Sequence, residues 1–186
     1  MRKLQGAVLA VMLAGLTGCT SVASRYPLFP ENAKEVVFDP ALLGRWQDPE
    51  DDNRIYQVTR LNESSYAIEW KEDGKSVIAT VQLLKVRGVL LANAAVIDAN
   101  DSEHYFTRHF LAKVRTEPDK IQVAAMSTQW LIDRIVATGK PAHDPAEEGS
   151  SNLVLTAPSA ELRKYLLPYA DRPEAFEKET ELHRVK

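Results

Sequence analysis

The four histidines are the residues of this chain best suited to metal binding or acid–base catalysis, because an imidazole ligates metals and titrates near neutral pH. His104 and His109 flank one predicted strand five residues apart, and an odd separation places two side chains on opposite faces of a strand. His143 lies in a predicted loop and His183 in the last predicted strand, and neither has a partner at ligand spacing. We therefore predict surface histidines and no metal site.

A second group with chemical potential is a cluster of oxygen-bearing side chains: Asp48, Glu50, Asp51, Asp52 and Asn53. Oxygen donors of this kind suit calcium. The cluster lacks the glycine-centred loop and the distant glutamate of an EF-hand. We therefore interpret it as a solvated hairpin loop.

Sequence signatures of the common enzyme classes are missing. The chain has no Gly-x-Ser-x-Gly elbow, no His-Glu-x-x-His helix and no glycine loop that could cradle a phosphate. Ser64 and Ser65 fall in a predicted turn, and Asp133 and Arg134 are predicted as surface charges on a helix. We predict that the protein is not an enzyme and has no cofactor, although a catalytic set assembled across strands would not be visible in such spacings.

The N-terminus has the pattern of an export signal. Two basic residues, Arg2 and Lys3, precede an apolar run over residues 6–16, and small residues follow it. The run is shorter than the roughly 20 apolar residues that a membrane-spanning helix needs. We predict a signal peptide over residues 1–18.

The segment Leu16-Thr17-Gly18-Cys19 resembles the lipobox of bacterial lipoproteins. The resemblance implies that the Cys19 thiol receives a diacylglyceryl group, that cleavage follows Gly18, and that the new amino group is acylated, for example with palmitate. Several acyl chains hold a protein firmly at a membrane, whereas one binds only reversibly. Thr20, in place of an aspartate, implies an outer-membrane location facing the periplasm.

Composition narrows the partners of the exported chain. The net charge of the full chain is −3 at pH 7, and loss of Arg2 and Lys3 makes it more acidic, so we predict no nucleic-acid binding. Cys19 is the only cysteine, and lipid attachment would consume it. The domain is therefore expected to lack disulfides.

The exported part is predicted to consist of a tether and one domain. Residues 19–43 contain Pro27, Pro30 and Pro40 and are predicted as the lipidated N-terminus and tether; the alternative is that Tyr26, Leu28 and Phe29 dock on the domain. Residues 44–186 are predicted as a mainly β domain with two to three short helices. Alternating apolar residues predict an antiparallel meander of strands over 54–61, 66–71, 77–85, 89–97, 105–115 and 121–125.

Helical spacing follows the meander. Ser127 or Thr128 is predicted to cap a helix that ends at Gly139, and Ser159 is predicted to cap a second helix that ends at Pro168. A short strand over 152–156 separates them, a further helical turn is expected over 173–176, and a closing strand over 180–185. This order predicts a barrel or half-barrel with helices before its last strand.

The tripeptide Gly44-Arg45-Trp46 at the start of the predicted domain resembles the Gly-x-Trp signature of the lipocalins and wider calycin barrels. The resemblance implies that Trp46 closes the base of a barrel and that an arginine near the last strand, here Arg184, packs over its ring. The chain has no counterpart of the family's Thr-Asp-Tyr motif, and its helix comes earlier than in a lipocalin. The segments STQWLIDRIVATGK, LVLTAPSAELRKYL and LHRV also resemble a family of small bacterial lipoproteins, a resemblance that implies no activity.

Five aromatic residues separate two functional hypotheses: Tyr56, Tyr66, Trp70, Phe106 and Phe110. They either fill the core of a small barrel or line a pocket for one small apolar ligand. A hollow barrel favours a membrane-anchored envelope lipoprotein that binds an apolar molecule or lipid. A filled barrel favours an accessory subunit of an envelope complex, or an enzyme inhibitor, that docks through its surface.

Overall fold

The structure is a computed structural model of the full chain, and it describes residues 22–30, 33–72, 74–97, 107–144 and 153–186. The predicted signal peptide over residues 1–18 and the lipidation site Cys19 lie outside the described residues. So do His104 and Phe106.

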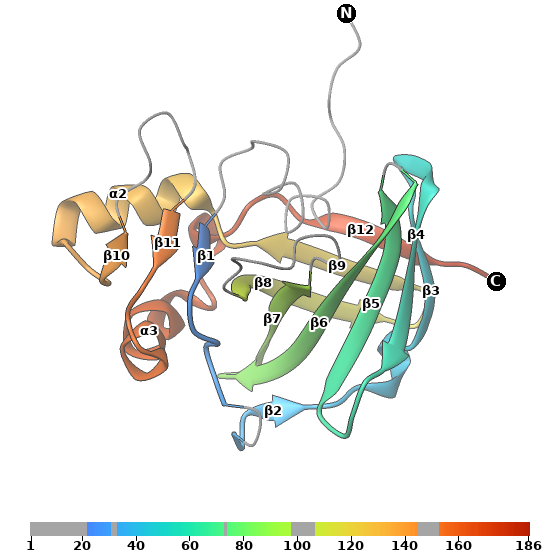
Figure 1. Ribbon diagram of the computed structural model, residues 1–186, viewed down its shortest axis with the longest axis horizontal. Helices are drawn as coiled ribbons and strands as arrows, with labels where there is room; N and C mark the ends of the chain where they lie inside the picture. Colours follow the sequence, from blue (N-terminus) through green and yellow to red (C-terminus); the bar gives the residue numbers. More distant parts are fainter. Residues whose placement is uncertain (1–21, 31–32, 73, 98–106, 145–152) are drawn as a thin grey trace, which may run out of the picture.

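Eight strands form a closed antiparallel barrel (Figure 1). Seven of them follow one another as a meander: β3 (Gly44–Asp48), β4 (Asp51–Arg60), β5 (Ser65–Glu72), β6 (Lys75–Val86), β7 (Val89–Ile97), β8 (Arg108–Glu117) and β9 (Lys120–Ala125). The last strand, β12 (Thr180–Arg184), pairs antiparallel with both β9 and β3. The predicted meander and the closure by the last strand are therefore confirmed, and the sheet is a full barrel instead of a half-barrel.

Alternation of side chains separates the inside of the barrel from its outside. The interior holds one apolar cluster to which every barrel strand contributes, including Trp46, Tyr56 and Leu182. Hairpin geometry fixes the register: Val86 pairs with Val89, so only Arg87 and Gly88 remain in the turn. Both have positive φ angles, 51° and 83°, which is the backbone of a tight turn whose twist matches that of the strands.

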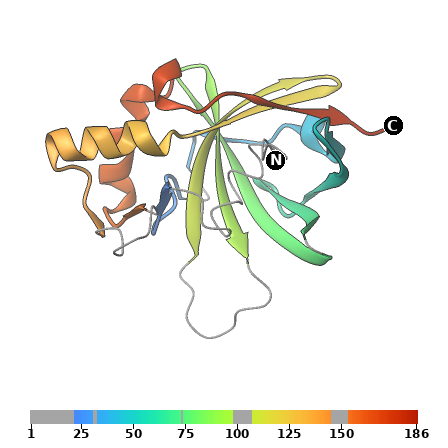
Figure 2. The same cartoon turned by 90° about the horizontal axis from the view of Figure 1, so that it is seen from above.

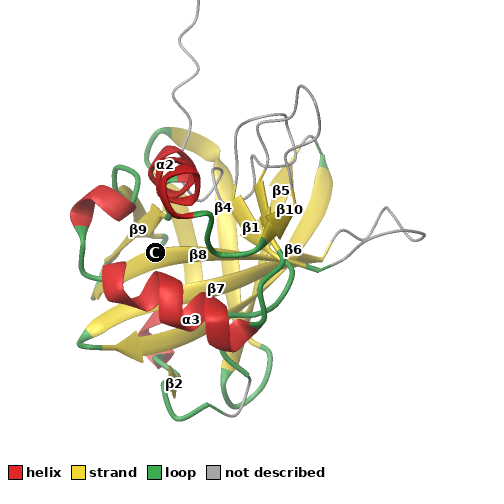
Figure 3. Cartoon of the chain, turned by 90° about the vertical axis from the view of Figure 1, so that its left-hand side faces the viewer, coloured by secondary structure: helices red, strands yellow, loops and turns green. Residues whose placement is uncertain are grey.

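A second layer covers one side of the barrel (Figures 2 and 3). It consists of α2 (Thr128–Thr138), β10 (His143–Asp144), β11 (Leu153–Leu155), α3 (Ser159–Leu166), and two short 3₁₀ turns, η3 (Leu167–Tyr169) and η4 (Pro173–Ala175). A second apolar cluster lies between this layer and the outer face of the barrel, where Leu84 and Leu91 meet Leu131 and Leu162.

Over its described part the N-terminal segment lies against the barrel, which is the alternative to a tether that Tyr26, Leu28 and Phe29 suggested in the sequence. β1 (Val22–Ser24) pairs with β8 and β11, and β2 (Val36–Val37) pairs with β6. Leu28 and Phe29 are only 3% and 5% exposed, whereas Tyr26 is 43% exposed. Burial of these two apolar side chains stabilises the docked arrangement.

The caps of the two helices differ from one another. The hydroxyl of Ser127 accepts a hydrogen bond from the backbone N–H of Trp130, and Gly139 ends α2 with a φ of 64°, as predicted. The prediction that Ser159 caps α3 is wrong. Pro158 occupies the cap position and its carbonyl accepts from Leu162, so Ser159 already lies inside the helix. α3 ends at Leu166, and Pro168 belongs to the 3₁₀ turn that follows.

The acidic cluster lies at a hairpin, as predicted, and Glu50 in its turn is exposed, but the burial of Asp48 corrects the interpretation of the whole cluster as solvated. Asp48 pairs with Asp51, so only Pro49 and Glu50 form the turn and the remaining cluster residues belong to β4. The side chain of Asp48 is completely buried. One of its oxygens accepts a 2.8 Å hydrogen bond from the backbone N–H of Glu50, and its Oδ2 has no partner among the described residues.

Candidate functional site

The floor of the barrel is built around Trp46 and Arg184, which come from neighbouring strands. Trp46 is completely buried, and its indole N–H donates to the carbonyl of Leu42 over 2.8 Å. The Arg184 guanidinium lies 4.2 Å from the centroid of the Trp46 ring. It also donates to the carbonyls of Ala41, at 2.5 Å, Leu43, at 3.0 Å, and Pro118, at 3.1 Å. The arginine therefore ties the η2 turn (Pro40–Leu42), the β8–β9 turn and β12 together over the indole face.

Gly44 has a backbone and steric reason to be glycine. Its φ is +127°, in a region that other residues rarely adopt, and a Cβ here would lie 2.9 Å from Nη1 of Arg184. Because that guanidinium is held by several carbonyls, it has little freedom to move aside. Gly44, Trp46 and Arg184 thus form one structural unit.

Above this floor the barrel contains a partly open apolar cavity of about 60 Å³. Its wall is apolar throughout: Leu42, Trp46, Tyr56, Val58, Tyr66, Ile68, Val81, Leu83, Ala92, Val114, Ile121, Val123 and Leu182. One water needs roughly 10–15 Å³, and an engineered cavity of about 150 Å³ binds benzene. The space therefore exceeds that of one water but is much smaller than the roughly 300–1,000 Å³ of a pocket for a drug-sized ligand.

The predicted aromatic residues take three different places. Tyr56 and Tyr66 line the cavity. Trp70 is buried in the same core and packs against Tyr56 at a ring distance of 6.1 Å. Phe110 is half-buried and does not line the cavity, and Phe106 lies outside the described residues.

Tyr66 joins the cavity to the polar rim of the floor. Its ring stacks on Phe38 with centroids 4.6 Å apart. Its hydroxyl donates to the carbonyl of Asp39 over 3.1 Å and accepts from the backbone N–H of the same residue. Burial raises the pKa of the Tyr66 hydroxyl, so it remains protonated and able to donate at neutral pH.

A second recess lies on the outer wall of the barrel, and we call it the outer groove. Its volume is about 180 Å³, and it is lined by Pro27, Phe29, Leu61, Asn62, Ser65, Thr80, Val81, Gln82, Asn93, Ala95 and His109. The register pairs Ser65 with Gln82, and Gln82 with Asn93. Directly opposed residues share a sheet face, so these three side chains form a polar row across β5, β6 and β7.

Sequence reasoning missed this groove and misjudged His109, which it placed on the surface. The His109 ring is half-buried beside Asn93, and burial lowers its pKa. Gln82 and Asn93 occupy outward positions of their strands, which a sequence pattern assigns to solvent. They are buried because residues 27–29, distant in the sequence, lie over that wall. The one available signal was the apolar pair Leu28-Phe29 beside two prolines.

The other predicted polar residues are scattered. The His143 ring contacts the carbonyl of Pro141 over 2.9 Å. Arg134 is not a simple surface charge: its guanidinium lies 4.7 Å from the Tyr169 ring centroid and bonds the Tyr169 hydroxyl. Asp133 does lie at an exposed position, where it accepts from Gln129. Within the described ranges no group of three or more His, Cys, Asp or Glu side chains could hold a metal ion.

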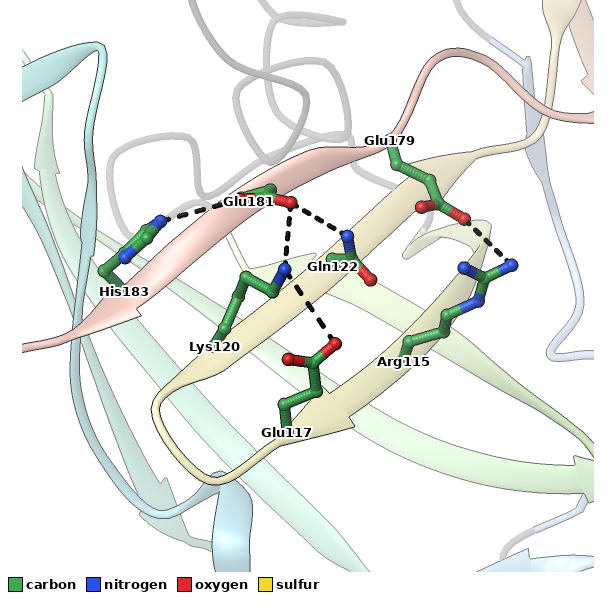
Figure 4. A network of polar contacts seen from close by, with 7 residues as sticks. All are labelled: Arg115, Glu117, Lys120, Gln122, Glu179, Glu181 and His183. Atoms are coloured by element: carbon green, nitrogen blue, oxygen red, sulfur yellow. Dashed lines mark hydrogen bonds and ion pairs between the residues drawn. The ribbon is translucent and has the colours of Figure 1, made fainter.

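His183 belongs to a polar network on the outside of β8, β9 and β12 (Figure 4). Glu181 is at its centre, accepting from Lys120 over 3.1 Å and from Gln122 over 2.9 Å, with the His183 ring 3.7 Å away. The bond from Lys120 and, to a smaller extent, the bond from Gln122 lower the pKa of the Glu181 carboxyl. The network connects β12 to β9 and so reinforces barrel closure.

Comparisons with known proteins give no match: no family model, curated protein or solved structure is significantly similar to this chain. In the part of the chain that the structure describes, none of the helices combines the length and apolar character required to cross a bilayer.

Proposed function

We propose that the protein is a non-enzymatic lipoprotein of the bacterial cell envelope, anchored through Cys19 and related to the calycins, whose barrel accepts a slim apolar group such as the end of an acyl chain. The anchor proposal rests on the lipobox Leu16-Thr17-Gly18-Cys19. The calycin proposal is supported by the contact between Arg184 and Trp46 at the barrel floor. The location most consistent with Thr20 is the outer membrane, facing the periplasm.

The apolar cavity is the observation that carries the ligand proposal. An unfilled cavity costs stability, on the order of 1 kcal/mol for a volume of about 60 Å³. The wall keeps this space open with a small side chain, Ala92, where a larger aliphatic residue would fill it. Because the lining offers no polar surface, its occupant must be apolar where it enters, and the volume admits a narrow chain end more readily than a ring.

Quenching of tryptophan fluorescence tests this proposal. A dodecanoic acid brominated at its chain end is titrated into the full chain held in detergent micelles. Since Trp46 lines the cavity, we expect saturable quenching that unbrominated dodecanoic acid reverses by competition. Ala92→Leu fills the cavity and should abolish the saturable component.

The matched control is Ala67→Leu, which makes the same change at a position between Tyr66 and Ile68 whose side chain faces away from the cavity. It should leave the quenching intact. Near-ultraviolet circular dichroism checks that both variants keep the fold. Quenching that does not saturate, or that survives in Ala92→Leu, would contradict the proposal.

The alternative function, an accessory subunit or enzyme inhibitor that docks through its surface, is favoured by the small size of the cavity relative to the barrel. Four large side chains, Trp46, Tyr56, Tyr66 and Trp70, already occupy the interior. Crosslinking in intact membranes separates the two functions. A stoichiometric protein partner, combined with no quenching, would support docking.

A further inference from the structure

The outer groove places polar side chains in buried positions on the outer wall of the barrel. Barrel strands β5 to β8 are each paired on both sides, so their backbone groups are satisfied and only side chains face the groove. Gln82 and Asn93 are 8% and 7% exposed. Burying amide side chains costs free energy unless they find partners, and both amides have them: Asn93 bonds Leu28 and His109, and Gln82 also interacts with its surroundings.

The hydrogen bonds of Asn93 determine which ring nitrogen of neutral His109 carries the proton. The backbone N–H of Leu28 donates to Oδ1 of Asn93 over 3.3 Å, which assigns the other amide atom, Nδ2, as a donor. Nδ2 lies 3.2 Å from Nδ1 of His109, so this ring nitrogen accepts and the proton of a neutral imidazole sits on Nε2. Nε2–H has no partner among the described residues, and it therefore offers a hydrogen-bond donor.

Ser65 adds a second group without a partner. Its hydroxyl oxygen is shielded from solvent, lines the same groove, and makes no hydrogen bond to any described residue. A hydroxyl both donates and accepts. Leaving it unsatisfied destabilises the free protein, which makes it a group that a bound molecule would satisfy.

The lining also determines the charge of the molecule that fits. None of the residues that line the groove is Lys, Arg, Asp or Glu among those described, and a buried charge without a partner is strongly disfavoured. Apolar surfaces of Phe29, Pro27 and Leu61 stand beside the polar row. The site therefore suits an uncharged molecule with hydroxyl groups on its edge and carbon–hydrogen faces.

We propose that the outer groove binds a neutral sugar, with Ser65 and His109 as its hydrogen-bonding groups, Gln82 and Asn93 as the polar wall between them, and Leu61 and Pro27 as the apolar surface beside them. Sugar hydroxyls donate and accept at the same atom, which matches a row of amide, hydroxyl and imidazole groups. A peptide strand is less suitable because it would pair with a free sheet edge, and this wall has none. The volume of about 180 Å³ accepts a unit of monosaccharide size.

Nuclear magnetic resonance of the His109 ring nitrogens tests the proposal in the full chain in micelles. Glucose, galactose, N-acetylglucosamine and the charged analogue glucuronate are titrated separately, and His109→Gln assigns the signal. We expect at least one neutral sugar to shift the His109 signal saturably. Glucuronate should bind at least about tenfold more weakly, because its charge would be desolvated without a partner.

Two serine variants separate a binding site from a water-filled recess. Ser65→Ala should weaken sugar binding about three- to tenfold, the loss of one hydrogen bond, while the melting temperature stays equal or rises. Ser76→Ala is the matched control, because this exposed serine lies on β6 outside the groove and bonds Glu69; it should leave the affinity unchanged.

Three results would overturn the proposal. They are no shift of the His109 signal by any neutral sugar at millimolar concentration, equal binding of glucuronate, and unchanged affinity in Ser65→Ala. The first would mean that ordered water alone satisfies the groove.

Discussion

At the scale of single residues, Arg184 makes the most consequential set of contacts. Replacement by alanine removes the cation above Trp46 together with the donors to the carbonyls of Leu43 and Pro118. We expect Arg184→Ala to lower the free energy of unfolding by about 2–4 kcal/mol, since a cation–π contact and hydrogen bonds from a charged donor are lost together. Urea unfolding followed by tryptophan fluorescence measures the change.

Two companion variants interpret that measurement. Arg184→Lys keeps the charge but loses the planar guanidinium that reaches several acceptors. Its stability should therefore lie between those of the unaltered protein and Arg184→Ala. Arg172→Ala removes an arginine with an exposed side chain and should change stability by less than about 0.5 kcal/mol. If the Arg184→Ala protein were as stable as Arg172→Ala, the guanidinium would not hold the floor.

Residues of the floor could be identified from the sequence, whereas most buried polar residues could not. Gly44 and Trp46 stand together in a short motif, and a closed barrel requires the last strand to meet the first. Asp48, Arg134 and His109 looked like surface residues because each stands in a polar or alternating context. Their burial depends on which distant segment covers them, and no local spacing records that.

At the scale of elements, the N-terminal segment is the feature that joins the barrel to its helical layer. Phe29 packs into the outer apolar cluster, with the Arg163 guanidinium 5.1 Å from its ring. We expect Phe29→Ala to cost about 3–5 kcal/mol, the usual range for removing a buried phenylalanine. Tyr26→Ala, at a largely exposed aromatic three residues earlier, should cost less than about 1 kcal/mol.

Thermal and urea unfolding of both variants provide the comparison. Equal, small losses in the two proteins would mean that the segment behaves as a tether in solution. A large loss in Phe29→Ala alone would mean that the segment belongs to the folded unit.

Strands were easier to predict than the packing of irregular segments. The predicted strand over 89–97 coincides with β7, and the predicted limits of β5 and β9 differ from the observed ones by a single residue, because alternation is strong on a half-buried sheet. Residues 22–43 carry no such period, and their prolines suggested an extended chain. Their docking was only an alternative suggested by Leu28 and Phe29, because the pairing of β1 with β8 and of β2 with β6 depends on tertiary contacts that no local period records.

At the scale of the whole molecule, the free energy of unfolding depends on pH through two titratable groups on different walls of the barrel, His109 and Glu181. His109 has a pKa below its ordinary value of 6.5 because it is buried. His109 therefore binds a proton more weakly in the folded protein than in the unfolded chain. Stability falls as the pH decreases below about 6.5, because protonation then favours the unfolded chain. Glu181 has a pKa below its ordinary value of 4.5 because Lys120 and Gln122 bond its carboxylate, so its contribution is present above that value and is lost at lower pH.

We therefore expect the melting temperature to fall in two stages as the solution is acidified from neutral pH, first through the titration range of His109 and then through that of Glu181. Calorimetry of the full chain across this pH range measures the effect. His109→Gln should remove the first stage, because no imidazole remains to be protonated on unfolding. His183→Gln replaces an exposed imidazole on the other wall and should retain the first stage. If the first stage instead persisted in His109→Gln and disappeared in His183→Gln, the transition would belong to the network around Glu181. That result would contradict the buried, neutral state of His109.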